Sequence, residues 1–226
     1  MALRCVECGR IYPEVFRLEC DCGGSLDVVN DFEGSFDSLL NSSDLDNNRY
    51  SEFVTIDNLF VPDLRLPITP IVKREIDGIH VDFKLDYSMP TGSFKDRGTY
   101  VTISKLNEVG IDEVSLDSSG NAAISLSIFA NSENIETHIF IPSDISEGKK
   151  RVLNRFAYKV HEVTGSRMEV HRRARNFDGV EYITHWLNPY FIEGTKLIAY
   201  EIIEQSDVDV VLVPTGSGTL LMGLYK

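Results

Sequence analysis

The sequence predicts an α/β fold in which mostly parallel sheets are flanked by helices. From residue 66 onward, short apolar runs rich in Val and Ile alternate with longer segments typical of helices. Turns of small residues follow two of these runs, at residues 118–121 and 215–219, where such a fold binds ligands. The chain has 226 residues, 42% of them hydrophobic, which is enough for a sizeable core.

The strands and helices are expected to alternate along the chain. Five short apolar runs predict strands at residues 81–85, 114–116, 139–141, 160–163 and 208–213. Longer segments predict helices at residues 94–109, 121–130, 147–156, 166–176 and 193–204. Ser93 is expected to cap the first of these helices and Gly110 to end it, because Ser is favoured at N-caps and Gly accepts the left-handed conformation.

The region before residue 66 has a different composition. Residues 31–65 are rich in Asp, Asn and Ser and contain short apolar anchors such as Phe60-Val61. This pattern favours a linker that crosses the surface. We therefore expect residues 28–65 to connect an N-terminal module, residues 1–27, to the α/β part of the chain.

The four cysteines lie in two close pairs within the first 22 residues. Cys5 and Cys8 form one pair, Cys20 and Cys22 form the other, and eleven residues separate the pairs. Four thiolates in this pattern are typical of a tetrahedral zinc site, and the glycine after each pair suits a tight turn. Two disulfides are the alternative, although a bridge between Cys20 and Cys22 would be strained. We expect a structural, zinc-ribbon-like module whose folding energy comes from the metal.

The charge of the chain bears on its partners. Lys and Arg number 22 and Asp and Glu number 35, so the net charge is −13. This balance argues against a broad nucleic-acid or anionic-membrane surface. The sequence has no apolar run long enough to span a bilayer and no signal-peptide core at Met1. We therefore expect a soluble cytoplasmic protein that binds neither nucleic acid nor membrane.

The octapeptide Pro90-Thr91-Gly92-Ser93-Phe94-Lys95-Asp96-Arg97 contains the candidate catalytic residue. It lies between a predicted strand and a predicted helix, so the backbone on both sides can hold Lys95 in a cleft. Such placement suits a lysine whose amine must be desolvated and deprotonated to attack a carbonyl. The alternative is a solvated lysine in the first turn of a helix.

Two loops are candidate anion sites. Thr215-Gly216-Ser217-Gly218-Thr219 follows a predicted strand, and its glycines let backbone N–H groups approach a phosphate closely. Ser118-Ser119-Gly120-Asn121 has the same placement and could hold a carboxylate or phosphate. Each loop could instead be an ordinary connection or helix cap. Together with Lys95, they favour a cofactor that carries both an aldehyde and a phosphate.

Five segments in order resemble the motifs of threonine synthases, a family of tryptophan-synthase-like pyridoxal-phosphate enzymes. They are the lysine octapeptide, Ser118-Ser119-Gly120-Asn121-Ala122-Ala123, Ser146-Glu147-Gly148-Lys149, Asn188-Pro189-Tyr190 with Glu193-Gly194, and Val213-Pro214-Thr215-Gly216-Ser217-Gly218-Thr219. The resemblance implies a two-lobed fold. Residues 66–100 and 190–226 would belong to a larger cofactor-binding lobe, and residues 101–189 to a smaller one. Threonine synthases of the archaeal type carry a similar cysteine-paired module.

The resemblance also implies roles for individual residues. Lys95 would hold pyridoxal 5'-phosphate covalently, and Asn121 would bond the ring hydroxyl. The cofactor phosphate would be bound by Gly216, Ser217, Gly218, Thr219 and Leu220, and the substrate carboxylate by Ser118, Ser119 and Gly120. Lys149 and Arg97 are candidates for the phosphate of an amino-acid phosphate substrate. The implied reaction is that of a lyase in threonine biosynthesis, which converts O-phospho-L-homoserine and water to L-threonine and phosphate.

Several positions depart from the family pattern. Ala122 stands where Thr is usual, Phe191 where Arg is common and Leu197 where Thr is common. These departures leave open another reaction on the same scaffold, such as cysteate synthesis or threonine deamination. The chain is also shorter than the family's, so we expect a fragment, a truncated and inactive relative, or a chain that needs a partner. Members of this fold commonly form homodimers.

Overall fold

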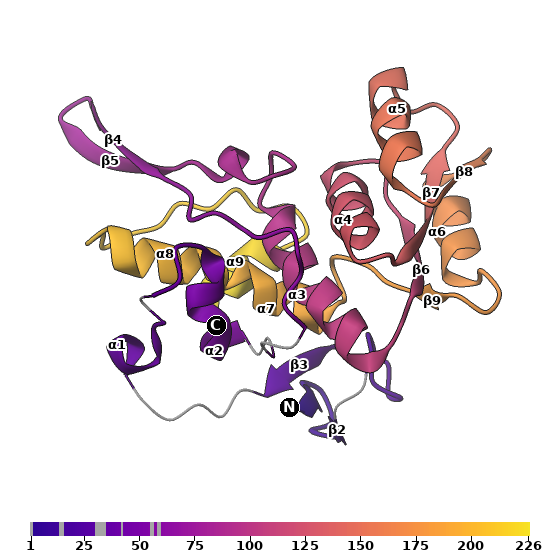
Figure 1. The fold of residues 1–226 in the computed structure, drawn as a ribbon, viewed down its shortest axis with the longest axis horizontal. Helices are drawn as coiled ribbons and strands as arrows, with labels where there is room; N and C mark the ends of the chain where they lie inside the picture. Colours follow the sequence, from indigo (N-terminus) through magenta and orange to yellow (C-terminus); the bar gives the residue numbers. More distant parts are fainter. Residues whose placement is uncertain (1, 14–15, 30–34, 42, 55–56, 58–59) are drawn as a thin grey trace.

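The computed structural model describes residues 2–13, 16–29, 35–41, 43–54, 57 and 60–226. Its centre is a parallel sheet in the order β8-β7-β6-β9, formed by β6 (Glu113–Asp117), β7 (Glu136–Pro142), β8 (Lys159–Val163) and β9 (Glu181–Tyr182). Helices α4 (Asn121–Ser132) and α5 (Glu147–Phe156) lie on one side of this sheet, and α6 (Arg167–Arg175) lies on the other (Figure 1). The predicted parallel sheet with flanking helices is therefore confirmed.

A second group of helices packs beside the sheet. It consists of α3 (Lys95–Val109), α7 (Pro189–Thr195), α8 (Leu197–Gln205) and α9 (Thr219–Tyr225). The segment predicted as one helix at residues 193–204 is therefore two helices, and the first begins earlier, after the Asn188 cap. Helix α3 ends at Gly110 as predicted, with φ of 72°. The predicted Ser93 cap is wrong: Phe94 precedes the helix, and the buried Ser93 hydroxyl makes no hydrogen bond to the described residues.

Two of the predicted strands behave differently in the fold. The run at residues 81–85 is part of β5 (Ile79–Lys84), which pairs antiparallel with β4 (Ile71–Ile76) in a projecting hairpin outside the parallel sheet (Figure 1). The run at residues 208–213 forms no strand. Several of its apolar side chains are exposed, among them Val210 and Leu212. A strand needs neighbours for its backbone hydrogen bonds, and the described residues supply none there.

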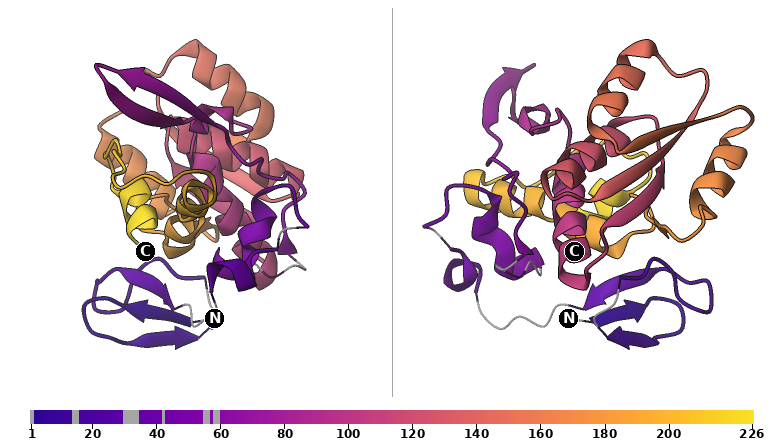
Figure 2. Two further views of the ribbon diagram at one scale, coloured as in Figure 1. Left: turned by 90° about the vertical axis from the view of Figure 1, so that its left-hand side faces the viewer. Right: turned by 45° about the vertical axis from the view of Figure 1, so that its right-hand side comes forward.

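The N-terminal module is a small antiparallel sheet set apart from the parallel one (Figure 2). Its order is β2-β1-β3, formed by β1 (Ala2–Cys5), β2 (Ile11–Pro13) and β3 (Leu26–Val29). The region expected to be a surface linker instead contributes to the core. It contains α1 (Phe36–Leu39), η1 (Asn47–Tyr50) and α2 (Ser51–Val54), and it buries Tyr50 and Phe53 against Tyr200 of α8.

A buried ionic network joins these parts around Arg97. Its guanidinium is fully buried and donates to Asp86 at 2.7 and 3.0 Å, to Glu201 at 2.6 Å, to Asn47 at 3.2 Å and to Thr69 at 3.0 Å. The five N–H donors of an arginine are thus all used. Lys84 adds a second cation, 2.5 Å from Glu201. The network connects η1, η3 (Asp86–Ser88), β5, α3 and α8.

Removing the Arg97 guanidinium should destabilise the fold strongly. In an Arg97→Met variant, Glu201 and Asp86 would lose their main cation, and breaking a buried ion pair on one side costs about 3–5 kcal/mol. We expect the free energy of unfolding, measured by urea denaturation, to fall by about that amount. The control is Arg172→Met, which removes an exposed arginine paired with Glu169 and should change little. Equal stability of the two variants would contradict the structural role of Arg97.

Candidate active site and cysteine cluster

The candidate active site lies where two neighbouring strands of the parallel sheet end. Strands β6 and β9 pair in parallel, and the N–H of Ile183 extends the pairing to the Ser115 carbonyl at 2.8 Å. Their carboxyl ends are therefore adjacent. The serine loop, residues 118–121, follows β6, and the segment that carries His185 follows β9. In open α/β sheets this edge is the usual ligand site.

Lys95 is the first residue of α3, and the preceding turn is fixed by Asp96. The N–H of Thr91 donates to the buried Asp96 carboxylate at 2.7 Å, and Gly92 adopts φ of 82° within the turn. The Lys95 Nζ lies 4.0 Å from the centroid of the Phe94 ring and 5.8 Å from that of Phe191. No described residue accepts a hydrogen bond from it. Burial lowers the pKa of Lys95 to about 8, so its amine is partly neutral near neutral pH.

Close packing of α7 against α3 places Phe191 beside Lys95. The contact depends on two glycines. A Cβ on Gly98 would lie 2.4 Å from the Phe191 ring, and a Cβ on Gly194 would lie 2.1 Å from the Arg97 carbonyl oxygen. Asn188 caps α7, accepts from the N–H groups of residues 190 and 191, and donates to Thr102 of α3 at 3.1 Å. These contacts orient the apolar wall of the site.

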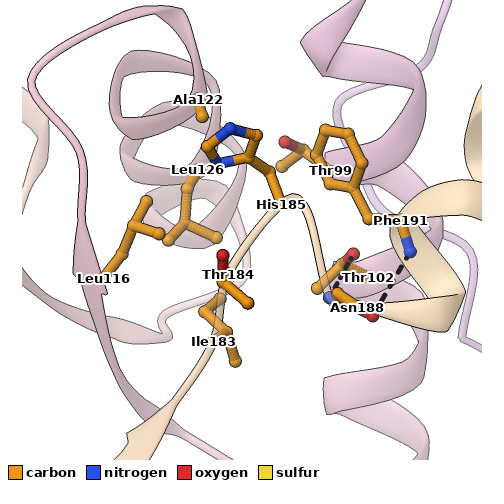
Figure 3. Close-up of a pocket in the computed structure, with 10 residues that line it drawn as sticks. All are labelled: Thr99, Thr102, Leu116, Ala122, Leu126, Ile183, Thr184, His185, Asn188 and Phe191. Atoms are coloured by element: carbon orange, nitrogen blue, oxygen red, sulfur yellow. Dashed lines mark hydrogen bonds between the residues drawn. The ribbon is translucent and has the colours of Figure 1, made fainter. Parts of the chain in front are cut away.

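A small cavity lies beneath this wall (Figure 3). It is lined by Thr99, Thr102, Leu116, Ala122, Leu126, Ile183, Thr184, His185, Asn188 and Phe191. Its free volume is about 20 Å³, which is room for about one water molecule. The cavity forms the floor of the candidate site, and its lining is mostly apolar.

His185 is a site residue that the sequence did not indicate. Figure 3 shows its ring between Leu126 and Ala122 on one side and Phe191 on the other. Its Nδ1 is buried and makes no hydrogen bond to the described residues. Burial, and then the charge of Lys95, lower the pKa of His185 to about 4, so the imidazole is neutral at pH 7. A lone histidine in a loop carries no sequence signal for this role.

The two predicted anion loops both precede helices. In the serine loop, Ser118 is buried, its hydroxyl accepts from the Gly120 N–H at 3.3 Å, and Asn121 is exposed at the start of α4. The glycine loop, residues 216–220, exposes Gly216 and Ser217, and Gly218 takes φ of 86° before α9. Thr219 is buried, and its carbonyl accepts from Thr195 of α7 at 3.0 Å. No hydrogen bond among the described residues links the glycine loop to Lys95 or to the serine loop.

The two predicted substrate-phosphate residues differ in outcome. Lys149 is exposed on α5 and remains a candidate. Arg97 does not: it is fully buried and every one of its donors is used within the protein. The sequence alone could not show this, because the residues that bind Arg97 come from four distant parts of the chain.

The four cysteines converge in the N-terminal module. Cys5 Sγ lies 3.6 Å from Cys22 Sγ, Cys8 Sγ lies 3.5 Å from Cys20 Sγ, and all four sulfurs are within 4.8 Å of one another. None forms a disulfide. Sulfurs placed about 2.3 Å from a central zinc have a spacing of about 3.8 Å, so the donor set fits a tetrahedral metal. Gly9 and Gly23 both adopt positive φ, as their positions in the turns predicted.

The chain belongs to the family described as pyridoxal-phosphate dependent enzymes, whose model matches residues 65–226. Threonine synthases are among its relatives. The threonine synthase of Methanocaldococcus jannaschii is 28% identical over an alignment of 243 residues. The alignment covers 100% of this chain and 60% of the relative. Serine racemase of Arabidopsis thaliana is 30% identical over 165 residues, 69% of this chain and 50% of the relative. The chain thus spans about half to three fifths of the length of these relatives.

Solved structures support the same fold. The processed form of threonine deaminase isoform 2 from Solanum lycopersicum superposes with a TM-score of 0.66 at 23% identity. The superposition covers 94% of this chain and 56% of the deaminase chain. Maize serine racemase gives a TM-score of 0.64 at 26% identity, over 70% of this chain and 51% of the racemase chain. Among the described residues, no helix is both long and apolar enough to cross a membrane.

The burial of Lys95 should be visible in its reactivity. Only the neutral amine reacts with acylating reagents, so a pKa of about 8 means that labelling rises as the pH increases through 8 and then levels off. An exposed lysine titrates near pH 10.4. We expect competitive acetylation, followed by mass spectrometry, to give a midpoint near pH 8 for Lys95 and a higher one for the pooled surface lysines. A Lys95 midpoint near 10 would show that its amine is solvated.

The cysteine cluster should bind one zinc ion per chain. We expect removal of zinc by a chelator to unfold the N-terminal module, because metal binding supplies the folding energy of so small a unit. Elemental analysis gives the stoichiometry, and hydrogen exchange of residues 2–29 gives the unfolding. A Cys8→Ser variant should lose zinc, and an Asp21→Asn variant should keep it as the neighbouring control. Full zinc retention by Cys8→Ser would rule out the four-sulfur site.

Proposed function

We propose that this chain carries the lysine half of a pyridoxal-phosphate-dependent lyase of the threonine synthase type. The reaction converts O-phospho-L-homoserine and water to L-threonine and phosphate. The observation that carries the proposal is Lys95, a partly buried amine with a lowered pKa at the start of α3, whose charge acts on His185 after β9. The similarity to threonine synthases over the full length of this chain supports the choice of reaction.

The residues of the site fit this cofactor. Lys95 would hold it covalently, since its amine has no competing hydrogen bond to the described residues. Asn121 is exposed at the edge of the site and would bond the ring hydroxyl. The cofactor phosphate would be bound by Gly216, Ser217, Gly218, Thr219 and Leu220. Ser118, Ser119 and Gly120 would bind the substrate carboxylate, and pyridoxal phosphate would supply the electron sink for carbanion chemistry.

Lys95 would also transfer the proton. Its neutral amine would accept the proton from the α-carbon of the substrate and later return one to the product. A base works best when its pKa is near the working pH, and burial supplies that match. The rings of Phe94 and Phe191 lie close to the amine and would reduce its contact with water.

A second reaction on the same site is supported by particular residues. Ala122 and Phe191 present apolar surface to the pocket, and relatives include a serine racemase and an L-threonine ammonia-lyase from Thermotoga maritima, 30% identical over 158 residues. Deamination or racemisation of an unphosphorylated hydroxy amino acid needs no phosphate subsite. The alternative function is therefore an enzyme that acts on L-serine or L-threonine.

The cofactor test uses the purified chain and borohydride. We expect added pyridoxal phosphate to give a visible absorbance band and, after reduction, a mass increase on the peptide that contains Lys95. Lys95→Ala should abolish both, and Lys159→Ala, which removes an exposed lysine of β8, should abolish neither. A modified Lys159 or an unmodified Lys95 would refute the assignment.

The reaction test follows on the loaded chain. We expect phosphate release and L-threonine formation from O-phospho-L-homoserine to depend on Lys95 by at least about 10³-fold, as is usual for a covalent catalytic residue. Equal or faster turnover of L-serine or L-threonine would favour the alternative function.

A further inference from the structure

A cation is held at the rim of the candidate active site by the end of β6. Arg167, the first residue of α6, donates from Nη2 to the Asp117 carbonyl at 2.7 Å, and the same atom forms an ion pair with the Asp117 carboxylate at 2.9 Å. Asp117 immediately precedes the serine loop. The guanidinium is therefore tied to the strand end from which that loop begins.

Asp117, which holds Arg167, is itself fixed by several contacts. Asp117 is only 3% exposed. Its carboxylate accepts from the Tyr182 hydroxyl at 2.5 Å and lies 3.3 Å from His171 Nδ1. Because Tyr182 belongs to the neighbouring strand β9 and His171 to α6, the carboxylate cannot swing away without breaking contacts to two elements. Arg167 is consequently preorganised, although 55% of its side chain is exposed.

Arg167 retains donors for a ligand. Its Nε and Nη1 atoms have no hydrogen-bond partner among the described residues. They belong to a guanidinium that Asp117 holds in place through Nη2. The other arginines of α6 that lie nearby in sequence are used differently: Arg172 and Arg173 both pair with Glu169. Arg97 is fully buried. Unlike these three arginines, Arg167 has donors available for an anion at this edge of the sheet.

His185 connects this rim to Lys95. His185 follows β9, and Asp117, which holds Arg167, ends the adjacent parallel strand β6. Burial, and then the charges of Lys95 and Arg167, lower the pKa of His185, and the charge of Asp117 acts in the opposite direction. The buried Nδ1 of His185 makes no hydrogen bond to the described residues. A buried polar atom without a partner is costly, and a ligand that bonds to it would remove that cost. Of the ten residues that line the cavity, His185 is the one that titrates.

We propose that Arg167, with His185 beside it, binds the anionic side-chain group of the substrate, a phosphate or a similar dianion. This inference rests on the proposed function and assigns the substrate phosphate to α6 rather than to Arg97. The planar fork of a guanidinium matches phosphate oxygens. A neutral imidazole can donate one further hydrogen bond to such an oxygen without adding charge. In a chain of net charge −13, this local positive rim would also steer an anionic substrate.

Trp186 makes the proposal testable without any cofactor. It is the single tryptophan of the chain, follows His185 directly and has its ring centroid 6.5 Å from that of His171. We would titrate the purified chain with O-phospho-L-homoserine, with L-homoserine and with inorganic phosphate while recording tryptophan fluorescence. The variants are Arg167→Gln, Arg167→Lys and His185→Ala. The matched control is Arg173→Gln, which removes the same charge from the same helix at 54% side-chain exposure.

The expected result is selective. O-phospho-L-homoserine should bind about 10-fold or more tightly than L-homoserine, and Arg167→Gln should remove most of that difference, the size expected for one charge-assisted hydrogen bond. Arg167→Lys should retain part of it, His185→Ala should weaken it, and Arg173→Gln should leave it unchanged. Equal affinities of the Arg167→Gln and Arg173→Gln proteins for O-phospho-L-homoserine would overturn the proposal.

A separate measurement distinguishes this proposal from the proposed function. After borohydride reduction, the mass increase of the peptide that contains Lys95 should be the same in Arg167→Gln as in the unchanged chain, because Arg167 does not hold the cofactor. Cofactor loading without phosphate-selective binding would overturn the Arg167 subsite alone. Phosphate-selective binding without cofactor loading would leave the subsite standing and refute the proposed enzyme.

Discussion

The buried ion network around Arg97 is the constraint on which the candidate site depends. A fully buried guanidinium is tolerated only when its charge and all its donors are matched, and here Asp86 and Glu201 supply the charge. Arg97 lies two residues after Lys95, so its fixed position also fixes the start of α3. The network further brings η1 and α8 to that helix through Asn47 and Glu201. Stability and the placement of the reactive amine thus have one physical origin.

The sheet supplies the second half of the site by a different principle. Adjacent parallel strands end at the same edge, so the pairing of β6 with β9 brings the start of the serine loop close to the segment that carries His185. Helix α7 then closes the floor, because the absence of side chains at Gly98 and Gly194 lets it approach α3. The site is therefore built mainly from the ends of helices and strands that pack against one another. This packing favours a precise position for the Lys95 amine.

Desolvation gives these side chains their chemistry. Burial lowers the pKa of both Lys95 and His185, so His185 is neutral at pH 7 and Lys95 has a larger neutral fraction than an exposed lysine. The neighbouring Asp117 pairs with Arg167 and accepts a hydrogen bond from Tyr182, which places an ion pair at the rim of the site. An amine with a pKa of about 8 next to a charged rim is suited to proton transfer on an anionic substrate. The cysteine cluster lies in a separate sheet and makes no part of this arrangement.

The sequence by itself determined the local features. The alternation of elements from residue 113 to residue 175, the end of α3 at Gly110, the positive φ of Gly9 and Gly23 and the grouping of four cysteines follow from nearest-neighbour chemistry, and the structure has them. Only the tertiary structure decided that Arg97 is internal, that His185 lines the site, that Arg167 is anchored on Asp117 and that residues 208–213 form no strand. Burial, ion pairing and strand pairing depend on residues distant in the chain, and local periodicity does not contain that information.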